Sequence, residues 1–251
     1  MFVAMFVVAT TVVTIVQIRA DTRTADVGDA FEKLGQVAAY ADHRLAAAAN
    51  GSPLPAPPIL QADQRTLQVA LGVTLVTQAL VLGIAGISSR QTFTGLARSL
   101  GLQRYDIASV WRPGLAVIAA YVLVLVYSVA ADATGIGWLK PTSTVPIEIT
   151  RDHLTLSIAA VVTLIGAPFS EELFFRGLVF GGLLKWGFWP AAVGSAFLFT
   201  TFHLDPGSFI PFVLIGIGLA WLFWSRGTLW DSILFHFFFN AASFVFLAWG
   251  S

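Results

Sequence analysis

Residues 154–184 read LTLSIAAVVTLIGAPFSEELFFRGLVFGGLL. The first part, 154–170, carries no charge and is close to the roughly 20 residues that an α-helix needs to cross a bilayer. Lipid offers no hydrogen-bond partners to the backbone, so a continuously apolar spanning segment is helical. Two glutamates and an arginine then interrupt the apolar sequence, and ionisable groups inside a span mark a functional site by default. The stretch therefore predicts a helical membrane protein with a site inside it.

The same pattern extends along the whole chain of 251 residues, of which 57% are hydrophobic and 11% charged. Soluble domains carry about 25% charged residues, so a soluble protein is excluded. The apolar runs do not alternate with polar residues as the strands of a β-barrel do. We therefore predict an all-α, polytopic bundle of about eight transmembrane helices. Seven of the predicted helices are charge-free runs: 1–18, 66–89, 113–131, 154–170, 186–202, 206–225 and 232–251. The eighth is a shorter apolar piece, 173–184.

The composition also limits the chemistry and the partners of the protein. The net charge is zero, so nothing in the charge balance indicates a nucleic-acid partner. The chain contains no cysteine, which excludes disulfides and thiolate catalysis. The bilayer itself is the expected environment.

The N-terminal region, residues 1–150, shows no catalytic pattern and is separated here from a core of residues 151–251. The run 1–18 lacks a basic start and a small-residue cleavage site, so we interpret it as an uncleaved span. Residues 19–65 are predicted to be a polar loop with one amphipathic helix around Ala25 to Ala49. The four arginines of 90–112 indicate a cytoplasmic loop, whereas basic residues in 19–65 oppose the orientation that follows.

Glu171, Glu172 and Arg176 form the first candidate cluster. Glu172 and Arg176 are four residues apart, so they share a helical face and can form an ion pair. Glu171 is rotated by about 100° and is left free for chemistry. Ser170, which follows Pro168, is expected to cap a helix that begins at the glutamates, where the helix dipole favours carboxylates.

His203, His236 and Asn240 complete the candidate site. His203 ends an apolar run, and His236 and Asn240 are four residues apart on one face of the last span. The sequence has no HExxH zinc motif, although Glu171, His203 and His236 could still ligate zinc. Asn240 is a poor zinc ligand but a good amide donor. The set is thus suited to acyl hydrolysis, with a carboxylate that deprotonates water and with Asn and His donors at the oxyanion.

Simple hairpins would not bring these groups to one depth. If 172–185 and 186–203 form a hairpin, the rise per residue places His203 and His236 more than ~10 Å apart in depth. A tilted helix, or a helix broken near Pro168 or near Pro206 and Gly207, would close this gap.

The three motifs Glu171-Glu172-x-x-x-Arg176, Phe199-x-x-x-His203 and His236-x-x-x-Asn240 resemble those of the CPBP (Abi) family. That family comprises CAAX prenyl proteases and bacteriocin-processing enzymes, and the similarity covers roughly Leu154 to Trp249. The resemblance implies an intramembrane endopeptidase of a bacterial cell membrane.

The resemblance also implies the role of each residue. Glu171 is the general base for water, and His203 binds or orients that water. His236 and Asn240 form the oxyanion site, while Glu172 and Arg176 are structural partners. No cofactor is implied, although zinc on Glu171, His203 and His236 stays open because the family was long labelled metal-dependent.

The expected substrate is a membrane-associated peptide or protein, either prenylated or bacteriocin-like. The alternatives are a non-proteolytic scaffold, immunity or regulatory protein of the same family, and a transporter. A transporter would be expected to show internal repeats, and the sequence has none.

Overall fold

The structure is a computed structural model that describes residues 43, 46–47, 50–52, 64–88, 92–103, 105–141, 147–203 and 205–249. The predicted span 1–18 and nearly all of the predicted helix at 25–49 lie outside these residues. The described part is all-helical and has no strand. Five of its helical stretches are long and apolar enough to cross a membrane: Leu67–Ile87, Ile107–Thr134, His153–Trp186, Pro206–Arg226 and Trp230–Leu247. The chain is therefore a multi-pass membrane protein.

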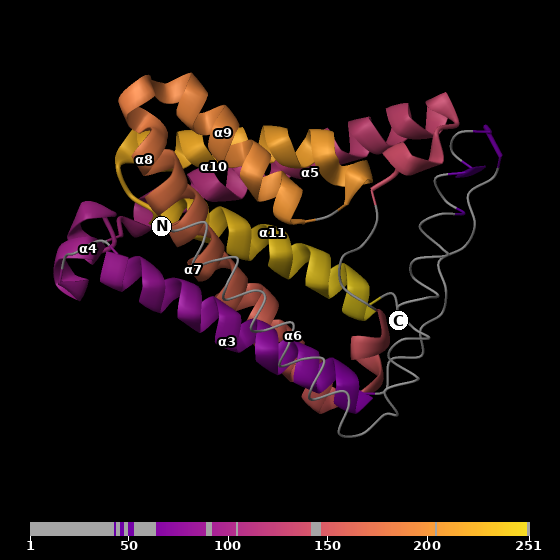
Figure 1. The fold of residues 1–251 in the computed structure, drawn as a ribbon, viewed down its shortest axis with the longest axis horizontal. Coiled ribbons are helices and arrows are strands. Elements are labelled where there is room, and N and C mark those ends of the chain that lie inside the picture. The colour runs from indigo at the N-terminus through magenta and orange to yellow at the C-terminus, as the bar shows by residue number, and fades with distance from the viewer. Residues whose placement is uncertain are drawn as a thin grey trace.

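The elements follow one another through short connections (Figure 1). Those named η are 3₁₀ or π segments, and several of them continue an α-helix without a break. In chain order the elements are α3 (Gln64–Ser88), α4 (Phe93–Ser99), η1 (Ile107–Ser109), α5 (Trp111–Thr134), η2 (Gly137–Leu139), η3 (Ile147–Arg151), α6 (His153–Val161), η4 (Val162–Gly166), α7 (Ala167–Glu172), η5 (Leu173–Phe180), α8 (Gly181–Leu183), η6 (Leu184–Trp186), α9 (Phe188–Phe202), η7 (Pro206–Ser208), α10 (Phe209–Arg226) and α11 (Trp230–Trp249).

The separate helices predicted at 154–170 and 173–184 are one continuous helical stretch, His153–Trp186, of 34 residues. The prediction of two helices was wrong, and the count of eight spans is not shown. Two π-helical segments, η4 and η5, carry the helix past Pro168 and past the charged residues. The predicted cap at Ser170 was wrong for the same reason. Ser170 lies inside the helix, and its hydroxyl donates to the carbonyl of Gly166 at 2.7 Å.

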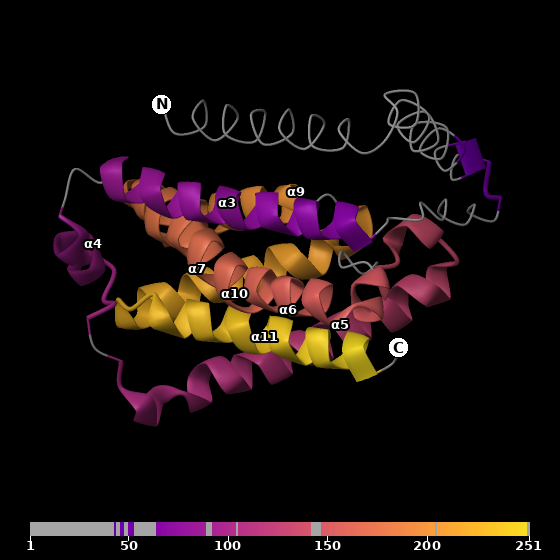
Figure 2. The ribbon, with the colours of Figure 1, turned by 90° about the horizontal axis from the view of Figure 1, so that it is seen from below.

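The long helix runs obliquely between its neighbours. A stretch of 34 residues is longer than the bilayer requires, and a helix of excess length tilts. Figure 1 shows α6 and α7 crossing between α3 and α11 at an angle, and Figure 2 shows α3 on one side of them and α11 on the other. The chain then turns at Gly187, whose φ of +99° favours glycine, and α9 returns along the long helix.

Amide side chains of α3 attach this helix to the long helix. The amide of Gln68 donates to the Asp152 carboxylate and to the Thr155 hydroxyl, both at 3.1 Å. The amide of Gln78 donates to the carbonyl of Val162 at 3.2 Å, in the first π segment. Such hydrogen bonds between helices replace the hydrophobic force that lipid cannot supply. They place α3 beside the part of α7 that carries the glutamates.

Candidate active site

Glu172 and Arg176 form the predicted ion pair, and both side chains are fully buried. Arg176 Nη1 donates to Glu172 Oε1 at 3.2 Å. The second guanidinium nitrogen, Nη2, donates to the carbonyl of Gly216 at 3.2 Å. His236 Nδ1 lies 3.0 Å from the same Glu172 oxygen. A buried charge is tolerated only when it is paired and hydrogen-bonded, so this cluster forms one unit across α7, η5, α10 and α11.

The ring of Phe199 connects the buried ion pair to both histidines. The Arg176 guanidinium carbon lies 4.5 Å from the ring centroid, within the range of a cation–π contact. The centroid of Phe199 is 4.5 Å from that of His203 and 6.1 Å from that of His236. The two imidazoles therefore flank one aromatic ring.

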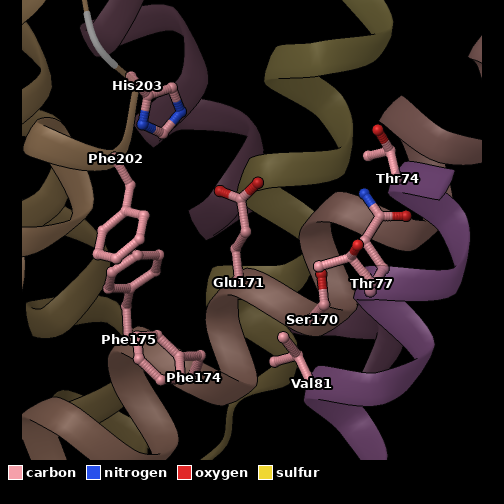
Figure 3. A pocket seen from close by; sticks show the side chains of 10 residues that line it. Thr74, Thr77, Val81, Ser170, Glu171, Phe174, Phe175, Phe202 and His203 are labelled. Carbon is pink, nitrogen blue, oxygen red and sulfur yellow. The ribbon is translucent and has the colours of Figure 1, made fainter. Parts of the chain in front are cut away.

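Glu171 and His203 line one cavity of about 330 Å³. They share it because they are equally far along the chain from the turn at Gly187. Figure 3 shows the Glu171 carboxylate extending into the cavity, with the phenyl rings on one side and α3 on the other. Glu171 Oε2 is buried and has no hydrogen-bond partner among the described residues. The lining residues are Thr74, Thr77, Gln78, Val81, Ser170, Glu171, Phe174, Phe175, Phe202 and His203.

The hydrogen bonds assign the tautomer of His203. Its Nδ1 lies 2.8 Å from the carbonyl oxygen of Phe199, which can only accept. Nδ1 must therefore carry the proton, and Nε2 of the neutral ring is an acceptor. A water molecule that donates one proton to Glu171 and the other to this nitrogen would keep a lone pair free for attack.

The same reasoning constrains His236. Its Nδ1 faces a carboxylate oxygen of Glu172, so Nδ1 donates and Nε2 of the neutral ring is again an acceptor. His236 can donate a hydrogen bond from Nε2 only when both nitrogens carry protons. It lies beside Phe199 and is not among the residues that line the cavity.

Asn240 is bound to the long helix. Its amide nitrogen donates to the carbonyl of Thr163 at 2.9 Å. In the π segment η4 the carbonyl of Val162 pairs with the amide of Ala167, so the next carbonyl in register would need an N–H from Pro168, which has none. Asn240 supplies that missing donor, and its second N–H stays available.

The α3 wall of the cavity, which is not among the residues predicted for the site, consists of Thr74, Thr77, Gln78 and Val81. The polar residues among them recur at positions i, i+3 and i+4 of a charge-free span. This spacing places them on one helical face, so the sequence contains a signal from which a polar wall on this helix could have been predicted.

The described side chains do not form a metal site. Among them no group of three or more His, Cys, Asp or Glu residues is arranged to hold a metal ion. Glu171 and His203 share the cavity, whereas His236 is not among the residues that line it. Glu171, His203 and His236 thus do not fit zinc as one ligand set, and no step of the mechanism below involves it.

Residues 153–242 match the family model described as "Type II CAAX prenyl endopeptidase Rce1-like". The match confirms the resemblance for this part of the chain and includes all three motifs, from Glu171 to Asn240. Helices α3 and α5 lie outside it. No curated protein and no solved structure matches the chain.

Proposed function

We propose that this chain, whose residues 153–242 match the Rce1-like type II CAAX prenyl endopeptidases, is an intramembrane endopeptidase. It hydrolyses a peptide bond of a membrane-associated substrate with water that a glutamate activates. One observation carries the proposal: the carboxylate of Glu171 and the imidazole of His203 line one cavity between membrane-spanning helices. A carboxylate that faces a cavity, beside one that is buried in an ion pair, is the arrangement expected of a general base beside a structural residue.

In the proposed reaction Glu171 and His203 hold the water between two acceptors. As the water oxygen bonds to the scissile carbonyl carbon, Glu171 takes one of its protons and a tetrahedral intermediate forms. The C–N bond then breaks, and protonated Glu171 returns this proton to the leaving nitrogen. The carboxylic acid and the amine are released, and the glutamate is again ionised. A positioned base of this kind contributes about 10²- to 10⁴-fold to the rate.

We propose that the oxyanion of this intermediate projects out of the Glu171 cavity toward His236 and Asn240, which do not line that cavity, and that these two residues stabilise it. Asn240 would use its second N–H, because its first is bound to Thr163. His236 would use Nε2–H, which requires the imidazolium form, held by the carboxylate of Glu172. Each oxyanion donor is worth about 10²- to 10³-fold in kcat.

The test is cleavage of an internally quenched peptide that ends in a prenylated Cys-aliphatic-aliphatic-X sequence, by purified protein in detergent. The Glu171→Gln variant keeps the size of the side chain and removes its basicity. We expect its rate to fall more than ~100-fold, with thermal stability close to wild type. An unprenylated copy of the peptide tests whether the lipid group is needed, and a chelator arm tests whether a metal is needed.

Each outcome of this assay is informative. Cleavage by Glu171→Gln at the wild-type rate would contradict the role of the base. Loss of wild-type activity with the chelator, and its recovery with Zn²⁺, would contradict the metal-free mechanism. Failure of the wild type on both peptides would favour a non-proteolytic scaffold or regulatory role.

A further inference from the structure

The hydroxyl groups that line the Glu171 cavity have all donated their protons to the backbone. Each of the three bonds runs to a carbonyl one helical turn earlier, with oxygen–oxygen distances of 2.7–2.9 Å: Thr74 to Ala70, Thr77 to Val73 and Ser170 to Gly166. Only the lone pairs of these oxygens are left for other partners. Each hydroxyl can therefore accept a hydrogen bond from a ligand but cannot donate one.

Most of the remaining polar groups of the cavity are also hydrogen-bond acceptors. Glu171 presents a carboxylate, and Nε2 of neutral His203 is an acceptor because Nδ1 is bound to Phe199. One N–H of the Gln78 amide donates to the carbonyl of Val162, which does not line the cavity, and the second N–H is the donor that the lining retains. A ligand that supplies hydrogen-bond donors complements this surface. A free carboxylate does not, because it would face a second carboxylate and few donors.

Helix structure alone accounts for the backbone bond of each hydroxyl, but it does not account for the presence of three such hydroxyls in one cavity. Threonines inside helices commonly bond to the carbonyl one turn earlier, and such a threonine has no further role by default. Here three such hydroxyls, from α3 and α7, line one cavity together with the unpaired glutamate. Thr77 is half-buried and Thr74 is exposed at the rim of the cavity. Accordingly, Thr77 is the stronger of the two α3 acceptors.

We propose that α3 is the substrate-binding wall of this site. Thr77, with Thr74 at the rim, accepts hydrogen bonds from the backbone N–H groups of the substrate peptide, and the C-terminal carboxylate of that peptide lies outside the cavity. The proposal rests on the proposed function for the identity of the ligand. It assigns substrate specificity to a helix outside the matched range 153–242.

The absence of native cysteines allows a direct test of contact. Thr77→Cys and Val76→Cys are introduced singly into the Glu171→Gln protein, and each is labelled with a small, uncharged thiol reagent that partitions into detergent. Val76 is the matched control because it is the neighbouring residue, is 57% exposed and does not line the cavity. We expect the prenylated peptide to slow labelling several-fold at position 77 and to leave position 76 unchanged.

A second experiment tests the hydrogen bond itself. Each amide at the end of the same peptide is replaced in turn by an ester, which removes one N–H, and binding to Glu171→Gln protein is measured. We expect one ester to weaken binding about 2- to 10-fold, the net worth of one hydrogen bond. Thr77→Val should bind that ester and the amide equally. Thr201→Val should keep the preference, because Thr201 makes the same backbone bond, to Phe197 at 2.8 Å, outside this cavity.

The outcomes separate this proposal from the proposed function. Cleavage of the peptide without protection of position 77 would overturn the α3 assignment and leave the endopeptidase standing. Protection without cleavage by the wild type would support the α3 site and contradict the endopeptidase. Equal protection at positions 76 and 77, or a preference retained in Thr77→Val, would also overturn the proposal.

Discussion

At the scale of single residues, two adjacent glutamates have opposite surroundings. Glu172 is fully buried and is bound through Oε1 to Arg176 and His236, whereas Glu171 lines the cavity. The rotation of about 100° between neighbouring helical residues produces this division. One carboxylate belongs to the buried ion pair, and the other is the proposed general base.

We predict that Glu172→Gln acts mainly on stability. The substitution leaves the Arg176 charge buried without a counter-charge, and breaking a buried pair in this way costs about 3–5 kcal/mol. Thermal unfolding in detergent should show a marked decrease in Tm. Glu171→Gln is the matched control and should unfold close to the wild-type temperature. Equal Tm values for both variants would contradict this division of roles.

Asn240 allows a second prediction at this scale. If its free N–H stabilises the oxyanion, Asn240→Ala should lower kcat by about 10²- to 10³-fold with little change in KM. If Asn240 serves only to satisfy the Thr163 carbonyl, the variant should lose stability and keep its kcat per folded molecule.

Asn240→Asp sharpens the comparison because it keeps the size of the side chain. It places an anion near the developing negative charge, so it should be at least as damaging as Asn240→Ala at neutral pH. Measuring kcat and Tm in the same detergent separates the two roles. A near-normal kcat in Asn240→Ala would exclude the oxyanion role.

At the scale of the elements, the site depends on how closely α9 and α10 approach. A Cβ atom on Gly216 would lie 2.9 Å from the Ala196 Cα, 2.8 Å from its Cβ and 3.4 Å from Arg176 Nη2. The missing side chain therefore lets α10 contact α9 and bring its carbonyl to the buried guanidinium. Small residues at helix crossings have this role in membranes.

We predict that Gly216→Ala destabilises the protein by about 1–3 kcal/mol, the usual cost of forcing extra atoms into a packed contact. Gly218→Ala is the control on the same helix, because a Cβ there would have no neighbour within 4 Å. Thermal unfolding of both variants tests the prediction. Similar Tm values for Gly216→Ala and Gly218→Ala would mean that α9 and α10 move apart without loss of stability.

At the scale of the whole molecule, α3 is joined to the matched region by hydrogen bonds at the start of α6. The Asp152 carboxylate accepts from the Thr155 amide at 2.8 Å, from its hydroxyl at 2.7 Å and from Gln68 at 3.1 Å. The bonds from Thr155, above all from its amide, hold the pKa of Asp152 below its ordinary value of 3.8. This carboxylate therefore caps one helix and binds another.

The direction of this shift predicts how stability depends on pH. The folded state favours ionised Asp152, so its contribution is complete above pH 3.8 and is lost as the pH falls through the lower pKa of the folded state. We expect the Tm of the wild type to fall more steeply below pH 3.8 than that of Asp152→Asn, which cannot titrate there. Parallel Tm curves for the two proteins would contradict the prediction.

Charge-free runs and helical spacing were sufficient to predict four of the spans and the buried ion pair. Charge-free runs predicted helical spans at 66–89, 113–131, 206–225 and 232–251, and each contains most of a membrane-length helix. The interval of four residues predicted the Glu172–Arg176 pair. These features depend only on bilayer thickness and on helix geometry, so a single sequence contains them.

The tertiary structure alone decided which groups meet. Two π segments continue one helix through both predicted helices, and the predicted cap residue Ser170 lies inside it. Packing of α11 against the long helix brings His236 to Glu172, and α3 supplies a cavity wall that is not part of any of the three motifs. Helix tilt and facing result from packing between segments far apart in the chain. In a span that is apolar on every side, the sequence of that span does not specify which face turns inward.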